Sequence, residues 1–152
     1  MALMLSYGMN TNVAQMASRC PNAISIGRVD IPNYRLVFRG VADIEESYGD
    51  TLQCVLWDIT KNCEKALDIL EGFPDFYGKE YIDVTFGKKT YTAMIYKMIG
   101  SDLGYSTPSS YYQVMLEDGY ADHGLDAQQI YEAEGFCEVE DTLDWINRRY
   151  AY

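Results

Sequence analysis

The sequence predicts an α+β fold, a small closed, mostly antiparallel β-barrel with peripheral helices. Two observations carry this prediction. Apolar runs and apolar–polar alternations typical of strands recur along the chain, separated by turn residues. The helical segments are inserted among the strands instead of alternating with them, which favours a mixed fold over a parallel sheet. The 152 residues contain no linker or internal repeat, so we expect one domain over residues 1–152.

The first predicted strand, residues 2–7, is apolar and runs into a polar turn that begins with Gly8. Thr11 or Asn12 can cap a short helix over residues 13–18. A glycine-bearing loop between a strand and a helix presents free backbone N–H groups, which can bind an anion. The Gly-rich phosphate-binding motifs are absent from the sequence, so a carboxylate is the expected ligand of this loop.

Further strands are expected at residues 24–29 and 34–39, on either side of a turn at Pro32-Asn33. A polar loop over residues 45–50 separates them from the next strand. That strand, residues 51–59, is nearly continuous in apolar character, which predicts a central position in the sheet.

A short helix is predicted before Glu71, capped at its start by Thr60. Its apolar stripe has helical spacing and consists of Cys63, Ala66, Leu67 and Leu70. Gly72 and Pro74 end the helix directly after Glu71. Apolar neighbours at such an exit desolvate a carboxylate and raise its pKa, so Glu71 is a candidate proton acceptor near neutral pH. A solvated carboxylate at a helix end is the alternative that these residues leave open.

A β-hairpin is predicted after this helix. Residues 77–86 alternate, and a turn at residues 87–89 leads back into residues 90–98. Thr107 and Pro108 form a good N-cap and first-turn pair for the next helix, which we expect to end near Gly119.

The C-terminal region is predicted to form two separate short helices. Asp126 caps the first, which ends at Gly135. The second covers residues 142–150, with Leu143 and Ile146 facing inward. The acidic residues of this region are interpreted as a solvated face.

The composition limits the classes of partner and cofactor. A formal net charge of −11 argues against nucleic-acid or anionic-membrane binding, which depends on clusters of Lys and Arg. The chain has no apolar run long enough to span a membrane and no basic segment at its start, so we expect a cytoplasmic protein. Four scattered cysteines and one histidine argue against a zinc site, and no cofactor is expected. The cysteines are interpreted as buried, reduced thiols: Cys20, Cys54, Cys63 and Cys137.

Two short motifs give the chain a resemblance to a known family. They are Tyr7-Gly8-Met9-Asn10 and Leu67-Asp68-Ile69-Leu70-Glu71-Gly72. With the segments between and after them, as far as Gly124-Leu125, the chain resembles the γ-glutamylcyclotransferase-like (AIG2-like, BtrG-like) superfamily over roughly four-fifths of its length. The chain departs from the family pattern at Met9, where Ser or Thr is usual, and at Gly78, where some members have Arg.

The resemblance implies a closed β-barrel with a cavity at one end and a reaction that needs no cofactor or metal. A γ-glutamyl compound is converted to 5-oxoproline and a released amine, with Glu71 as general base and acid. The resemblance implies that the substrate-binding residues are Leu5, Ser6, Tyr7, Gly8, Met9, Asn10, Tyr77 and Tyr112. The leaving group ranges within the superfamily from amino acids and peptides to amines, and this sequence does not specify it.

Two alternatives remain open at this point. Tyr7 and Tyr112 can serve packing alone, because 14 of the 152 residues are tyrosine. The whole domain can also be a non-catalytic module that binds a small ligand or a protein. An intact Glu71 between both motifs favours the enzyme.

Overall fold

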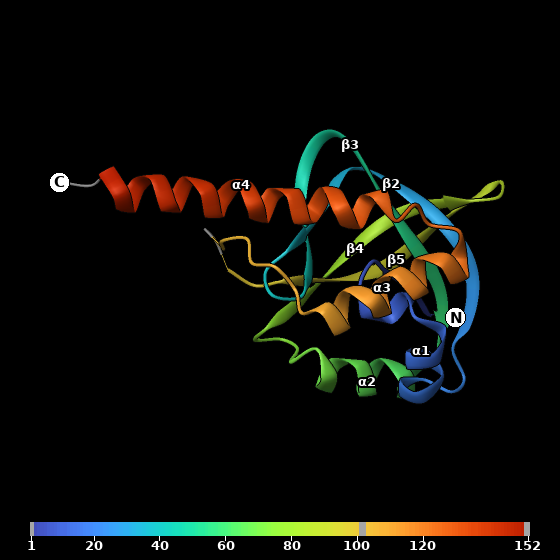
Figure 1. Ribbon diagram of the computed structural model, residues 1–152. Helices are drawn as coiled ribbons and strands as arrows, with labels where there is room; N and C mark the ends of the chain where they lie inside the picture. The colour runs from blue at the N-terminus through green and yellow to red at the C-terminus, as the bar shows by residue number, and fades with distance from the viewer. Residues whose placement is uncertain (1, 101–102, 151–152) are drawn as a thin grey trace.

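The computed structural model describes residues 2–100 and 103–150. Within these residues the chain forms a five-stranded sheet, four α-helices and one short 3-10 helix (Figure 1). Their bounds are β1 Ala2–Ser6, η1 Met9–Thr11, α1 Val13–Arg19, β2 Ile24–Phe38, β3 Ala42–Ile59, α2 Lys61–Leu70, β4 Tyr77–Phe86, β5 Lys89–Met98, α3 Ser110–His123 and α4 Gln128–Tyr150. The expected α+β fold is therefore present.

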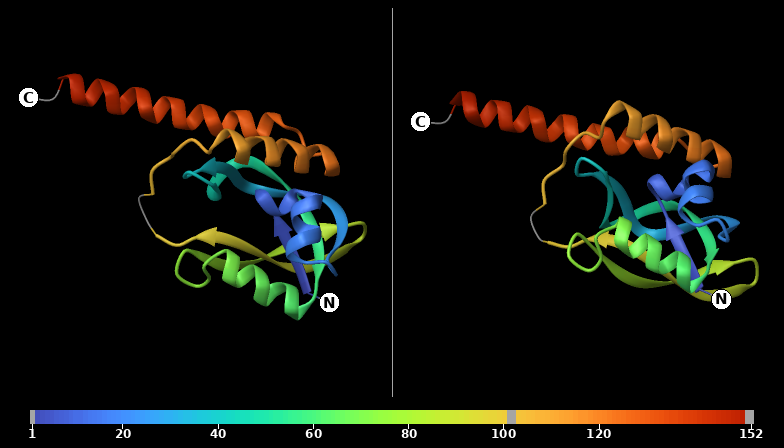
Figure 2. Two further views of the ribbon diagram at one scale, coloured as in Figure 1. Left: turned by 60° about the horizontal axis from the view of Figure 1, so that its bottom comes forward. Right: turned by 90° about the horizontal axis from the view of Figure 1, so that it is seen from below.

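The sheet has the strand order β2-β3-β1-β5-β4, and β1 runs antiparallel to β3 and parallel to β5. It curls strongly, as Figure 2 shows, but its edge strands β2 and β4 do not pair within the described residues. The prediction of a closed barrel was wrong for this reason. Side chains bridge the two edges instead, with Tyr34 Oη donating to Glu80 Oε2 at 3.5 Å.

The two strands predicted on either side of Pro32 form one long strand, β2, and β3 likewise continues through the expected loop at residues 45–50. The expected turn at Pro32-Asn33 is a β-bulge within the paired strands. Asn33 adopts a left-handed conformation at φ 65°, and the register shifts between Pro32 and Tyr34. The Asn33 Oδ1 accepts a hydrogen bond from Gly49 N at 3.0 Å, which ties the bulged segments together.

The core lies between the concave sheet and the helices that cover it. Its largest fully buried side chains include Tyr120 of α3, Phe38 of β2 and Leu67 of α2. Helix α3 packs on η1, α1 lies beside α2, and α4 lies along β2. This arrangement brings the loop after β1, the end of α2 and the start of α3 to one side of the molecule (Figure 1).

The start and end of α3 differ from the prediction. The N-cap is Ser109 instead of Thr107, and its Oγ accepts from Tyr112 N at 3.1 Å. The helix continues past Gly119 and ends at Gly124, which has the left-handed φ of 68°. A glycine within a helix costs only about 1 kcal/mol, so packing against the core overrides it.

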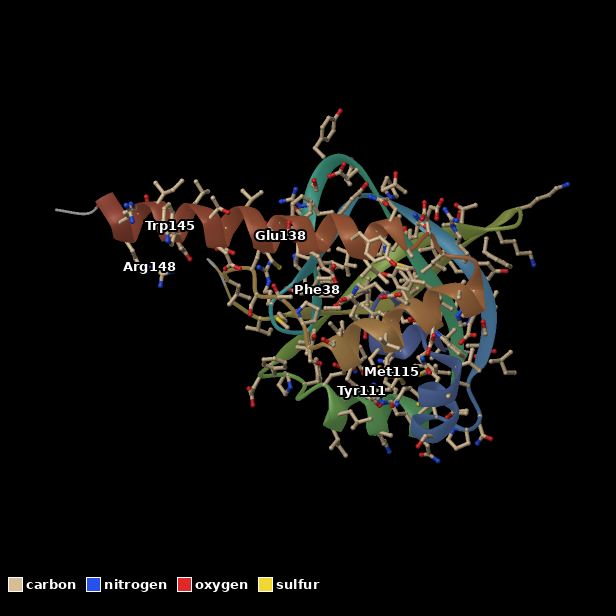
Figure 3. The ribbon with its side chains drawn as sticks, in the orientation of Figure 1. Phe38, Tyr111, Met115, Glu138, Trp145 and Arg148 are labelled. Atoms are coloured by element: carbon tan, nitrogen blue, oxygen red, sulfur yellow. A yellow bond between two sulfur atoms is a disulfide. The ribbon has the colours of Figure 1, made fainter. Side chains whose placement is uncertain are left out.

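The C-terminal region forms one helix, α4, instead of the two that were predicted. It runs through Gly135, and its last turns extend beyond the body of the protein, where Figure 3 labels Trp145 and Arg148. Leu143 and Ile146 are 55% and 39% exposed, so the prediction that they face inward was wrong. No helix among the described residues is long and apolar enough to cross a membrane.

The prediction that all four cysteines are reduced thiols was wrong, because Cys20 and Cys63 form a disulfide. They lie 43 residues apart in sequence, but the end of α1 and the first turn of α2 bring their Cα atoms to 5.1 Å. The sequence spacing gave no indication of this proximity. Cys54 and Cys137 are buried free thiols, as expected.

The disulfide leads to a testable result. Protein denatured without a reductant should present two reactive thiols, from Cys54 and Cys137, and four after reduction. Replacing Cys20 and Cys63 together by Ser should lower the free energy of unfolding by roughly 3–4 kcal/mol, because the closed loop restricts the unfolded chain. Thiol titration and denaturant unfolding measure both quantities. Four thiols in the unreduced chain would contradict the bridge.

Candidate active site

A cavity of about 320 Å³ opens where the loop after β1, the end of α2 and the start of α3 meet. All nine predicted site residues line it: residues 5–10 from the end of β1 and the following loop, with Glu71, Tyr77 and Tyr112. Six further residues that were not predicted also line it: Arg19, Val41, Ala42, Leu70, Phe76 and Tyr96. The volume lies at the lower end of the range for small-molecule sites.

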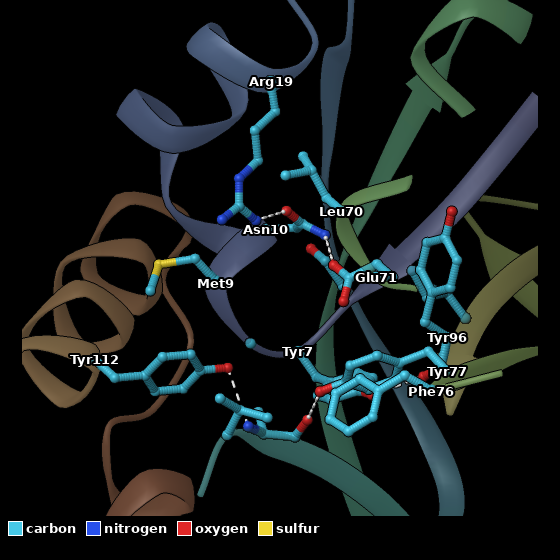
Figure 4. A pocket seen from close by; sticks show the side chains of 15 residues that line it. Tyr7, Met9, Asn10, Arg19, Leu70, Glu71, Phe76, Tyr77, Tyr96 and Tyr112 are labelled. Carbon is cyan, nitrogen blue, oxygen red and sulfur yellow. Dashed lines mark hydrogen bonds between the residues drawn. The ribbon is translucent and has the colours of Figure 1, made fainter. Parts of the chain in front are cut away.

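Glu71 reaches the cavity because α2 ends at this residue. Its N–H still donates to Leu67 O at 2.8 Å, so the residue keeps a helical conformation. Gly72 then turns the chain with a left-handed φ of 64°, and Phe76 N donates back to Gly72 O at 2.8 Å. The tight turn leaves the Glu71 side chain pointing into the cavity (Figure 4).

A chain of hydrogen bonds orients the Glu71 carboxylate. Asn10 Nδ2 donates to Glu71 Oε1 at 3.1 Å, and Arg19 Nη1 donates to Asn10 Oδ1 at 2.7 Å (Figure 4). Because Arg19 donates to the amide oxygen, the amide nitrogen of Asn10 must face the carboxylate. The carboxylate is thus fixed by a neutral donor, with the guanidinium one residue further away.

The environment of Glu71 favours its protonated form. Burial raises the pKa of Glu71, while the hydrogen bond from Asn10 and the charge of Arg19 oppose that shift in part. The net direction is upward, so the carboxylate holds a proton more readily than an exposed glutamate does. Such a group is suited to accept a proton and return it.

Four tyrosines line the cavity, and the hydroxyls of three of them, Tyr7, Tyr77 and Tyr112, contact the backbone. Tyr77 Oη donates to Ala42 O at 2.6 Å, and Ala42 N donates to Tyr112 Oη at 3.0 Å. Tyr7 Oη donates to Tyr96 O at 2.6 Å. Burial raises the pKa of all three phenols, that of Tyr112 to about 12, so they stay neutral. They fix the cavity wall and add no charge to it.

The loop after β1 lines the cavity and contains backbone N–H groups that are free to bind a ligand. Gly8 O is held by Thr11 N at 2.9 Å and by Thr11 Oγ1 at 2.7 Å. The N–H groups of Gly8 and Asn10 have no acceptor among the described residues. A Cβ on Gly8 would lie 2.9 Å from Ala42 Cβ and 3.1 Å from Tyr112 Oη, so only glycine fits there. This loop can accept a carboxylate through its N–H groups.

A cluster of charged side chains, Glu64, Asp68 and Lys79, supports the turn that follows Glu71. Asp68 accepts from Tyr96 Oη at 2.6 Å and from Lys79 Nζ at 2.9 Å, and its carbonyl accepts from Phe73 N at 2.9 Å. Lys79 also donates to Glu64 at 2.9 Å. Within residues 2–100 and 103–150, no group of His, Cys, Asp and Glu is arranged to hold a metal ion.

The residues missed by the sequence reasoning reach the site through contacts distant in sequence. Ala42 lies 35 residues before Tyr77 and 70 before Tyr112 and enters through its backbone. The neighbouring Asp43 pairs with Arg39 at 2.8 Å and accepts from Met98 N at 3.0 Å, so it holds strands together and does not line the cavity. One local signal was available for Arg19, which ends the helix that follows the Tyr7–Asn10 loop.

The chain was compared with protein-family models, curated proteins and solved structures. The family model "Gamma-glutamyl cyclotransferase, AIG2-like" matches residues 4–114. A solved structure named gamma-glutamyl cyclotransferase is similar with a TM-score of 0.76 and 22% identity, covering 88% of this chain and 86% of that chain. No curated protein sequence matches the chain significantly.

Two further solved structures are similar in fold. An uncharacterized protein from Homo sapiens has a TM-score of 0.75 and 22% identity, with 88% of this chain and 86% of that chain covered. YkqA from Bacillus subtilis has a TM-score of 0.70 and 20% identity, and the match covers 88% of this chain and 52% of that chain. Similarity at this level of identity shows the fold alone.

Proposed function

This chain belongs to the AIG2-like gamma-glutamyl cyclotransferase family, and on that premise we propose that it is a cofactor-free cyclotransferase acting on a γ-glutamyl compound. The products are 5-oxoproline and a free amine. One observation carries the proposal. The carboxylate of Glu71, with its raised pKa, lines the same cavity as a loop in which two backbone N–H groups have no acceptor within the described chain.

The reaction is an internal acyl transfer. The α-amine nitrogen of the glutamyl group attacks its own side-chain carbonyl carbon, the new C–N bond closes a five-membered lactam, and the bond to the leaving nitrogen breaks. The α-amine is mostly protonated at neutral pH and must lose a proton to attack. In our proposal Glu71 takes that proton, which passes to solvent. As the ring closes, Glu71 takes the second proton from the attacking nitrogen and delivers it to the leaving nitrogen, which departs as the amine.

The loop after β1 supplies the binding part of the proposal. In our proposal the N–H groups of Gly8 and Asn10, which have no acceptor among the described residues, hold the α-carboxylate of the glutamyl group. Holding this end beside Glu71 bends the substrate so that amine and carbonyl meet, which raises their effective concentration. The neutral phenols of Tyr7, Tyr77 and Tyr112 provide the wall against which the glutamyl chain lies.

Release of 5-oxoproline from a panel of γ-glutamyl compounds tests the proposal. The panel contains γ-glutamyl amino acids, glutathione and γ-glutamyl amines, and calorimetry measures binding of the same compounds. The expected result is release from at least one class, with a maximum rate above the Glu71 pKa. Binding of a compound with no release from any would identify a non-catalytic binding module instead.

The chain departs from the family motif at Met9, where Ser or Thr is usual, and this departure can be tested. Met9→Ser should change kcat and KM by less than about tenfold, because the proposed anion contact uses backbone N–H groups and not the side chain after Gly8. Steady-state kinetics on the best substrate measure this. A rise in kcat of more than about a hundredfold, roughly 2.7 kcal/mol, would instead show that a hydroxyl at this position is required.

A further inference from the structure

Arg19 has an unusual position in the cavity. Among the described lining residues it is the only side chain with a positive charge. It donates one hydrogen bond, from Nη1 to Asn10 Oδ1 at 2.7 Å, and no carboxylate of the described chain lies within 4 Å of it. An arginine has five N–H donors in a planar fork. Its remaining donors have no acceptor among the described residues.

The exposure of the lining residues separates a floor from a mouth. Tyr7 and Tyr77 are buried and form the floor. Leu70 is 55% exposed and Phe76 is 55% exposed, and both belong to the rim. Arg19 is partly exposed as well, and Figure 4 shows it on the side of Glu71 away from Tyr7 and Tyr77. Arg19 is therefore a residue of the mouth.

The proposed reaction assigns parts of the substrate to these two regions. The glutamyl group occupies the floor, where Gly8 and Asn10 line the cavity and their N–H groups have no acceptor among the described residues. The leaving group is bonded to the carbonyl that reacts near Glu71, and it must depart into solvent. It therefore lies toward the mouth, within reach of Arg19.

We propose that Arg19 binds a carboxylate on the leaving group, so that the substrate is a γ-glutamyl amino acid or peptide and not a γ-glutamyl amine. This inference rests on the proposed function. A guanidinium fork binds a carboxylate with two parallel hydrogen bonds, which gives orientation as well as affinity. Leu70 and Met9, which also line the cavity, can contact an apolar side chain of the same leaving group.

Arg19 also acts on Glu71 through Asn10, and the two effects must be separated. Loss of the Arg19–Asn10 hydrogen bond alters every substrate equally, because all substrates use Glu71. Loss of a leaving-group contact alters only substrates that carry the carboxylate. The ratio of kcat/KM for a matched pair of substrates therefore reports the second effect alone.

The experiment compares γ-glutamylalanine with its C-terminal carboxamide, which has the same shape without the charge. The parent protein should prefer the acid by roughly 10- to 100-fold in kcat/KM, the size expected for a charge-assisted hydrogen-bond pair. Arg19→Gln should bring the ratio to within about threefold of one, because the charge and the fork are both lost. Arg19→Lys should retain part of it, because the charge remains while the fork is lost. Arg28→Gln, at an exposed arginine paired with Asp30 that does not line the cavity, should keep the parent ratio.

The outcomes distinguish a failure of the role of Arg19 from a failure of the proposed function. A parent that uses the acid and the carboxamide equally well, or a parent preference that persists in Arg19→Gln, overturns the role of Arg19 and leaves the cyclotransferase intact. A parent that releases 5-oxoproline from neither compound, nor from any other γ-glutamyl compound, overturns the proposed function and the inference that rests on it.

Discussion

Glu71→Gln is expected to lower turnover by roughly 10²–10⁴-fold while the protein stays folded and still binds its ligand. Glutamine keeps the shape of the side chain, and its amide oxygen can accept the hydrogen bond that Asn10 Nδ2 now donates to Glu71 Oε1 at 3.1 Å. It cannot take a proton from the α-amine. Steady-state release of 5-oxoproline measures the loss, and calorimetry of the same compound measures the retained binding.

The pH dependence of this variant provides a second measurement. Burial raises the pKa of Glu71, so the folded protein binds this proton more tightly than the unfolded chain does. Stability contributed by the protonated form is present below the unfolded pKa and is lost as pH rises through the folded pKa. Glu71→Gln should therefore be more stable than the parent at neutral pH, and the difference should vanish as pH falls to the ordinary glutamate pKa of about 4.3.

A matched control variant tests whether the loss of turnover is specific to the carboxylate of Glu71. Asp75→Asn removes an exposed carboxylate from the turn after α2 that does not line the cavity, so kcat and its pH profile should be those of the parent. In the parent, turnover should rise with pH through the Glu71 pKa. Full turnover in Glu71→Gln, with that limb unchanged, would remove Glu71 from the mechanism.

Gly119→Ala is expected to be the most destabilising small substitution in this region, by about 3 kcal/mol. A Cβ at this position would lie 2.3 Å from Thr11 Oγ1, 2.7 Å from Asn12 N and 2.8 Å from Thr11 C. Two of these are backbone atoms of the loop that carries the cavity wall, so α3 must move away from it. The hydrogen bond from Asn12 Nδ2 to Met115 O, now 3.0 Å, would be strained or lost.

The melting temperature measures this effect, which should be roughly 6–12 °C for a domain of this size. Gly135→Ala is the matched control, since Gly135 is also a helical glycine but a Cβ added to it would have no described atom outside its own helix backbone within 4 Å. This variant should be neutral or stabilising by up to about 1 kcal/mol, because alanine is the better helix former. Equal melting temperatures for the two variants would contradict the close contact between α3 and the loop.

The parts of the site that could be predicted from sequence are those with local signals. Thr60 caps α2 and Gly72 ends it, so the position of Glu71 at a helix exit followed from neighbouring residues. Asn12 caps α1 in the same way, which placed the Tyr7–Asn10 loop between a strand and a helix. The family resemblance then linked these two local features, and the structure places both on one cavity.

The features that were missed depend on contacts between distant segments. Whether a curled sheet closes depends on how its two edge strands meet, and here the edges are bridged by Tyr34 and Glu80, which lie 46 residues apart. The Cys20–Cys63 bridge requires two helix ends to meet, which no spacing rule predicts. Gly119 and Gly135 were predicted to end helices by propensity, but tertiary packing and a favourable surrounding sequence carry α3 and α4 through them.

The identity of the products tests the proposed reaction more directly than any variant does. The parent protein is incubated with γ-glutamylalanine, and proton NMR follows both products over time. We expect 5-oxoproline and alanine in equal amounts with no free glutamate, because the nucleophile is the substrate's own α-amine. Alanine accompanied by glutamate would show that water attacks the carbonyl, and that result would contradict the proposed cyclotransferase.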